Sequence, residues 1–264
     1  MTSRDDTSAA RGLVTTATRQ QLFLETVLVL GVSLGSSAIY AVLTIIRKLT
    51  AGPPLSEQTT TMNNAVTPDR PWLDLAYQLA GIGLGVLPAF LALYLLMRDD
   101  GAAVRRIGAD LRRPGFDLAR GGLLAAAIGI PGLALYFGAR ALGLNTSIAA
   151  ANLEQTWWTI PVLVLAAAQN AILEEVVMVG YLFTRWSQAR WSFLTIALTS
   201  ALIRGTYHLY QGFGGFVGNI AMGLILAWAY RRWGRVGPLV VAHTILDIVA
   251  FVGYSALAGH VSWL

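Results

Sequence analysis

The sequence predicts an all-α fold, a polytopic membrane helix bundle of about seven transmembrane helices. Of its 264 residues, 55% are hydrophobic and only 12% are charged. A soluble domain carries roughly 25% charged residues. The apolar residues also gather into stretches of about 20, the length that a helix needs to cross a bilayer.

The first element is a polar tail over residues 1–20, rich in Thr, Ser and Arg. It lacks the apolar core of a secretory signal peptide, so we expect a flexible cytoplasmic tail. Segment 51–71 is rich in Pro, Thr and Asn and reads as a loop, and the charged segment 98–116 reads as a surface helix or loop. The predicted membrane helices are 21–46, 72–97, 117–142, 158–184, 192–210, 213–231 and 237–258.

The distribution of Arg and Lys predicts the orientation of these helices. Fourteen basic residues lie in the tail, in 98–120 and in the turns after the fourth and sixth helices, against four in the alternate loops. Basic loops stay in the cytoplasm. Seven helices with a cytoplasmic N-terminus fit this count, as in a multi-pass protein of a bacterial plasma membrane; an eighth short or re-entrant segment remains compatible with it.

Composition also excludes several classes of function. The chain has no cysteine, which rules out disulfide scaffolds, thiolate zinc sites and cysteine nucleophiles. The net charge of +5 comes mostly from Arg in short loops. That pattern fits membrane orientation, and we expect membrane lipid as a partner and no nucleic acid.

The chain divides into 21–157, whose helices carry no readable motif, and 158–258, whose helices carry ionisable groups inside apolar stretches. Each charged residue at a helix centre costs about 3 kcal/mol, so such groups should face one another or a wet cavity and mark a functional site. They form three pairs: Glu174 with Glu175, Arg204 with His208, and His243 with Asp247.

Helical spacing supports a shared site. The members of the second and third pairs are four residues apart, so each pair lies on one helix face. An antiparallel hairpin turning near 191–192 would put Glu175 level with His208 and Val179 level with Arg204. His208 would then lie about 20 Å from the turn between the fourth and fifth helices, and His243 about 10 Å from the turn before the seventh helix. Either that hairpin projects into the cytoplasm or the last helix begins inside the bilayer.

These residues resemble the CPBP (ABI) family of intramembrane proteases, which includes the type II CAAX-prenyl endopeptidases. The family pattern is Glu-Glu-x-x-x-Arg, then Phe-x-x-x-His, then His-x-x-x-Asn or Asp. It is matched by Glu174-Glu175, by His208 and by His243 with Asp247. The family Arg is replaced by Val179 and the family Phe by Arg204. We therefore expect Arg204 to replace the missing cation and to pair with Glu175.

The resemblance implies an intramembrane peptidase acting on a membrane-anchored or lipidated protein, and the residues suggest the same chemistry. A carboxylate in an apolar pocket suits a general base, so Glu174 is expected to activate water while His208 orients it or moves the proton. His243 and Asp247 could polarise the scissile carbonyl. An ionised Asp247 would repel an oxyanion, and could instead orient His243 or hold a metal.

The sequence leaves open whether the site uses a metal and whether the chain is an enzyme. Glu174, His208, His243 and Asp247 form an N/O donor set suited to zinc, although no His-Glu-x-x-His helix is present. The protease is therefore either a metalloprotease or metal-free. A non-catalytic scaffold or immunity-type membrane protein is the main alternative to a hydrolase, and a proton-coupled carrier is a weaker one because intramembrane Glu and His also serve as proton relays.

Overall fold

The structure is a computed structural model that describes residues 16–257. Most of the predicted tail 1–20 lies outside the described residues, as does His260, which we expect to be exposed. In chain order the elements are α1 (Arg19–Gly31), α2 (Leu34–Leu49), a 3₁₀ turn (Leu55–Glu57), β1 (Thr59–Asn63), α3 (Pro71–Gly85), α4 (Leu87–Asp99), α5 (Ala103–Arg106), α6 (Pro114–Ala141), β2 (Ser147–Ala151), α7 (Thr159–Glu175), a π-helical segment (Val176–Tyr181), α8 (Leu182–Gln188), α9 (Phe193–Tyr207), a second 3₁₀ turn (Leu209–Gln211), α10 (Phe213–Trp233) and α11 (Gly237–Leu257).

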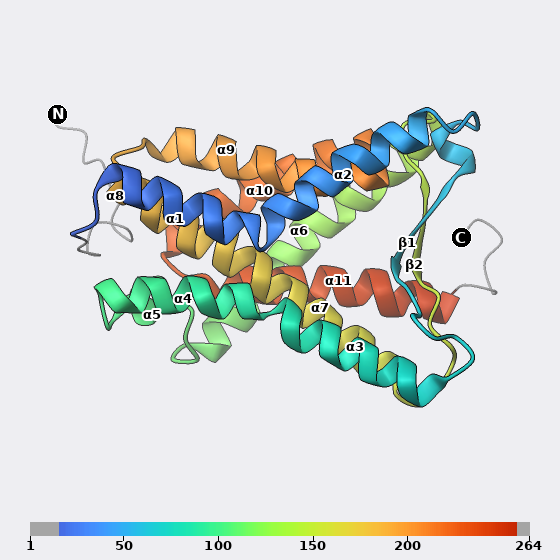
Figure 1. Ribbon diagram of the computed structural model, residues 1–264, viewed down its shortest axis with the longest axis horizontal. Coiled ribbons are helices and arrows are strands. Elements are labelled where there is room, and N and C mark those ends of the chain that lie inside the picture. The colour runs from blue at the N-terminus through green and yellow to red at the C-terminus, as the bar shows by residue number, and fades with distance from the viewer. Residues whose placement is uncertain (1–15, 258–264) are drawn as a thin grey trace.

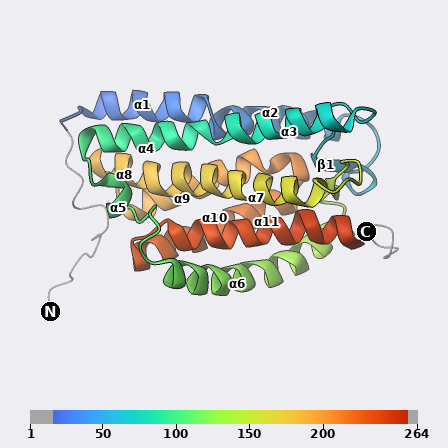
Figure 2. The same cartoon turned by 90° about the horizontal axis from the view of Figure 1, so that it is seen from below.

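The long helices run along one common direction and form tiers (Figures 1 and 2). Helices α1–α4 lie on one side, the continuous helix α7–α8 lies in the middle, and α11 and α6 lie on the other side. Helix α7 packs on α11, α11 packs on α6, and α9 packs on α10. In the most apolar stretch of the middle helix 61% of the residues are buried, against 17 to 33% in the other candidate spans. The middle helix is therefore the core of the bundle.

The fold class is confirmed, because each of the seven predicted stretches is helical. Four continuous helices are long and apolar enough to cross a membrane by length and composition: Pro71–Asp99, Pro114–Ala141, Thr159–Gln188 and Phe213–Trp233. A fifth is gained if α1 and α2 count as one span. Helix α9, which has 15 residues and carries Arg204, and the 17-residue apolar part of α11 are shorter. The total of seven membrane crossings stays a prediction.

The first predicted helix is broken. Its two halves, α1 and α2, meet at 56°. At the break the Ser33 hydroxyl donates to the Val29 carbonyl at 2.6 Å, which interrupts the backbone ladder. The first turn of α2 packs closely against the last turn of α1. A methyl group added to Gly35 would lie only 2.7 Å from the Leu30 carbonyl oxygen. The local sequence Gly-Val-Ser-Leu-Gly-Ser-Ser therefore specifies a bend that apolar length alone does not reveal.

The linker predicted as a loop over 51–71 contains regular structure. Strand β1 pairs in parallel with β2, in the register Thr59 with Ser147 and Asn63 with Ala151. The two strands tie the loop after α2 to the loop before α7 at one end of the bundle (Figure 1). Their pairing joins segments almost ninety positions apart, so local composition could not predict it. The charged segment 98–116 contains α5, as the prediction of a surface helix or loop allows.

The opposite end of the bundle is held by a buried cation. The Arg185 side chain is fully buried, and it bonds Glu25 and Asp99 at 2.7 Å each. Tyr181 also donates to Glu25, at 2.8 Å. These contacts fasten α1 and α4 to the middle helix, so the motif-free N-terminal region is fixed against the region that carries the motifs.

Helix α11 begins well inside the end of the α8–α9 hairpin. A methyl group on Gly180 would lie 3.2 Å from Val236 Cγ2, so the start of α11 lies level with Gly180. The middle helix continues for eight residues past that level, to the end of α8 at Gln188, which is about 12 Å of helix. This offset accounts for the unequal distances of His208 and His243 from their turns.

Candidate active site

Three helices bring the predicted polar residues together inside the bundle. Glu174 and Glu175 end α7, while Arg204 and His243 come from α9 and α11. All four are at most 8% exposed. Such burial is tolerated only when ionisable groups pair with one another.

Arg204 bridges the two glutamates. Its Nη1 donates to Glu174 Oε2 at 3.0 Å and its Nη2 donates to Glu175 Oε1 at 2.7 Å. The expected pairing with Glu175 is therefore present, and a second pairing, with Glu174, accompanies it. One planar guanidinium holds two carboxylates, the kind of recognition for which Arg is suited.

The predicted level of Arg204 is wrong by about one helical turn. Arg204 lies level with the glutamates rather than with Val179, and on the same side of the hairpin Ser200 donates to the Met178 carbonyl at 2.8 Å. Two features explain the difference. Helix α8 ends at Gln188, short of the predicted turn, and the π-helical segment before it puts more residues into each turn.

Tyr207 is a site residue that the sequence analysis missed. Its hydroxyl donates to Glu174 Oε2 at 2.6 Å, and Arg204 donates to the same oxygen. Tyr207 lies three residues after Arg204, so helical spacing alone could have placed it on the same face. Both hydrogen bonds that Glu174 accepts from the described residues fall on Oε2. The other oxygen, Oε1, accepts no hydrogen bond from the part of the chain that the structure describes.

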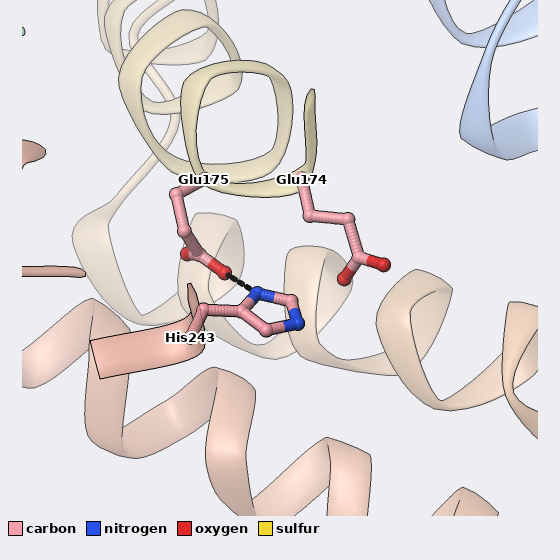
Figure 3. Close-up of side chains that lie close together, drawn as sticks. All are labelled: Glu174, Glu175 and His243. Atoms are coloured by element: carbon pink, nitrogen blue, oxygen red, sulfur yellow. Dashed lines mark hydrogen bonds and ion pairs between the residues drawn. The ribbon is translucent and has the colours of Figure 1, made fainter. Parts of the chain in front are cut away.

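His243 is oriented by Glu175. Its Nδ1 lies 2.7 Å from Glu175 Oε1, and Figure 3 shows the ring between the two glutamates with Nε2 on the side of Glu174. A carboxylate partner fixes the proton on Nδ1, which aims Nε2 into the site. The expectation that Asp247 could orient His243 is corrected, because its Oδ1 lies 3.7 Å from Nε2, too far for a hydrogen bond.

Asp247 and His208 complete the cluster. Asp247 lies beside Asn170, which comes one turn before the glutamates. His208 follows the end of α9, and its Nδ1 lies 3.1 Å from the Arg204 carbonyl. That bond puts the proton on Nδ1 and leaves Nε2 available. His208 is close enough to Glu174 for their charges to interact.

The donor set fits a metal poorly. Ligand atoms of Glu174, Glu175 and His243 lie within 4.8 Å of one another, a group that shares only Glu174 and His243 with the predicted zinc ligands. Arg204 already bonds both carboxylates, and Glu175 Oε1 also accepts from His243. Glu175 Oε2 is buried and has no hydrogen-bond partner in the described part of the chain. The guanidinium supplies the positive charge that a metal would otherwise bring.

The segment that carries these residues matches a known protein family. Residues 156–249 match the family described as Rce1-like, type II CAAX prenyl endopeptidase. The matched range contains the whole cluster and confirms the resemblance found from the motifs. Neither the curated proteins nor the solved structures gave a match.

Proposed function

We propose that this chain is an intramembrane endopeptidase, because residues 156–249 match the Rce1-like, type II CAAX prenyl endopeptidase family. It hydrolyses a peptide bond of a membrane-anchored or lipidated protein, with Glu174 activating the water. One observation supports this proposal above the others. Glu174 is held through Oε2 by Arg204 and Tyr207, and both histidines are close enough to its carboxylate for their charges to interact.

In the proposed reaction Glu174 Oε1 removes a proton from a water molecule, and the water oxygen bonds to the carbonyl carbon of the scissile peptide. His208 Nε2 accepts a hydrogen bond from the same water and orients it. The carbon–nitrogen bond then breaks, and the departing amine takes the proton that the water released. The groups that bracket the water come from α7 and α9, whose contact is fixed by Arg204.

His243 is the proposed stabiliser of the oxyanion. When Nε2 also carries a proton, the ring donates to the developing negative charge while Nδ1 stays bonded to Glu175. Asp247 Oδ1 lies 3.7 Å from Nε2, so it places a negative charge near the ring without a hydrogen bond to it. In this scheme Glu175 is a positioning residue, Asp247 adds a negative charge near His243, and Glu174, His208 and His243 are the catalytic residues.

We infer that no zinc takes part, because Arg204 already supplies a positive charge to both glutamates of the site. The expected result is full activity after dialysis against a chelator, with less than one bound divalent cation for every ten chains. A stoichiometric metal whose removal abolishes activity would contradict this inference.

The decisive experiment compares the new peptide termini in membranes that hold wild-type chain or Glu174→Gln at matched folded levels. Glu57→Gln is the matched control, since Glu57 is an exposed glutamate outside the site. We expect termini that appear with the wild type and with Glu57→Gln and disappear with Glu174→Gln. These termini would also identify the substrate.

A non-catalytic scaffold is the second candidate, favoured by the ion pairs that Arg204 makes with both glutamates. It predicts identical termini in all three membranes. A proton-coupled carrier predicts instead that Glu174→Gln alters a pH-dependent flux.

The apolar spans make the chain an integral membrane protein. We propose that it lies in a bacterial plasma membrane, and the distribution of Arg places its N-terminus in the cytoplasm.

A further inference from the structure

Arg120 is an exposed cation of α6 that is held between two aromatic rings. Its guanidinium carbon lies 5.7 Å from the centre of the Phe116 ring and 5.8 Å from the centre of the Trp233 ring. The two rings meet edge to face, with their centres 6.2 Å apart. A cation within about 6 Å of a ring centre is attracted to the face of that ring. The side chain is therefore held at the contact between the start of α6 and the end of α10.

This cation has no carboxylate partner in the described part of the chain. Its helix carries one acidic residue, Asp117, which bonds Arg235 instead. Arg113, which directly precedes α6, is also exposed. No ion pair of the described residues includes Arg113 or Arg120. Since a guanidinium has five N–H donors and no acceptor, the start of α6 offers donors and positive charge to a ligand outside the chain.

An apolar stripe of α6, formed by Leu123 and Ile130, continues from this cation. These residues follow Arg120 by three and ten positions, so the three side chains lie on one face of the helix. Leu123 is 61% exposed and Ile130 is 74% exposed. The opposite face of α6 packs on α11, where Gly121 lies against Val241. Figure 2 shows α6 on the outer side of the bundle, so the stripe faces outward.

The cation and the stripe together match the two parts of a phospholipid. Helix α6 is long and apolar enough to span a membrane, and its first turns belong to the basic segment that we expect in the cytoplasm. Tryptophan is frequent at the level of the lipid headgroups, and basic groups between helices on the cytoplasmic side bind anionic headgroups. We propose that Arg120 binds the phosphate of an anionic phospholipid of the cytoplasmic leaflet, with an acyl chain along Leu123 and Ile130. A guanidinium pairs with a phosphate through two parallel hydrogen bonds, and the two rings hold it ready for that contact.

The test titrates the purified chain in detergent with dioleoyl phosphatidylglycerol or with dioleoyl phosphatidylcholine, and native mass spectrometry counts the bound lipids. We expect the wild type to bind phosphatidylglycerol more tightly. Arg120→Gln should reduce this preference about fivefold, the factor for one basic residue at an anionic headgroup. Trp233→Leu keeps the charge but removes one ring, and should reduce the preference by a smaller factor. Arg105→Gln is the matched control, because it removes an exposed cation of α5 at the same end of the bundle (Figure 2) and should leave the preference unchanged.

The control and a competitor separate a lipid site from general attraction. Equal losses in Arg105→Gln and Arg120→Gln would mean that any basic residue at this end attracts anionic lipid, and would overturn the proposal. An unchanged preference in Arg120→Gln would overturn it as well. Glycerophosphoglycerol has the same headgroup without acyl chains, and we expect that an equal concentration of it displaces no lipid. Displacement would assign the position to a free phosphate compound instead. None of these measurements uses cleavage, so their outcome is independent of the proposed function.

Discussion

At the scale of single residues, the candidate site depends on how each side chain is held. Glu174 and Glu175 are adjacent in sequence and differ in their partners. The first shares Arg204 with its neighbour and accepts from Tyr207; the second accepts from His243. The two carboxylates therefore differ in the partner each has besides Arg204, a tyrosine hydroxyl on Glu174 and a histidine ring on Glu175.

Tyr207→Phe tests how Glu174 is held. Loss of a hydrogen bond to a charged group is worth roughly 1.5–3 kcal/mol, so we expect cleavage to slow about tenfold to a hundredfold while the fold persists. The assay is the initial rate on the substrate identified from new termini. Tyr230→Phe is the control, because its buried hydroxyl has no partner in the described part of the chain and its loss should not lower the melting temperature. An unchanged rate in Tyr207→Phe would remove Tyr207 from the site.

The exchange of the cation across the hairpin can be reversed. Arg204→Phe leaves two buried carboxylates without a cation and should cost about 3–5 kcal/mol. Adding Val179→Arg should restore part of that stability, because position 179 lies one turn from Glu175 on the same helix. Thermal unfolding in detergent measures both variants. A double variant that is less stable than either single variant would contradict the exchange.

At the scale of elements, the turn between α10 and α11 is fixed by another buried cation, Arg235. Arg235 bonds Asp117 at 2.7 Å and Asp110 at 3.0 Å. The backbone of the turn also donates to segment 107–108. These contacts set where α11 begins, and thereby the level at which His243 enters the site.

This turn should respond to acid. Burial opposes ionisation of Asp110, but hydrogen bonds from the Arg112 amide and from Arg235 hold its pKa below the usual value. A lowered pKa in the folded state gives stability that is present above the pKa of the unfolded chain and is lost as the pH falls through the folded value. Asp110→Asn should therefore melt lower at pH 7 and lose less stability between pH 5 and pH 3. Exposed Asp69→Asn is the control, and equal acid sensitivity in wild type and Asp110→Asn would contradict this reading.

At the scale of the whole molecule, the distribution of Arg predicts the orientation. Reporter domains fused after Arg113 and Arg190 should lie in the cytoplasm, and domains fused after Gly52 and Leu144 should lie outside. Each fusion is made twice, once with a reporter enzyme that is active only outside the cytoplasm and once with a reporter that is active only inside. The reporter that shows activity identifies the side on which that position lies. All four fusions on one side would reject a seven-span arrangement.

By itself the sequence determined the fold class, the approximate ranges of the long apolar helices and six ionisable residues that meet inside the bundle. Hydropathy and helical spacing are local properties, and an uncompensated charge in an apolar helix is costly wherever the helix packs. The motifs therefore revealed both the family resemblance and the expected pairing of Arg204.

Only the tertiary structure decided which atoms meet. The level of Arg204, the donation from Tyr207 and the choice of Glu175 over Asp247 as the partner of His243 depend on a π-helical segment and on where α11 begins. The pairing of β1 with β2 joins segments far apart in the chain. Such contacts follow from how the helices pack against one another, and no local pattern encodes that packing.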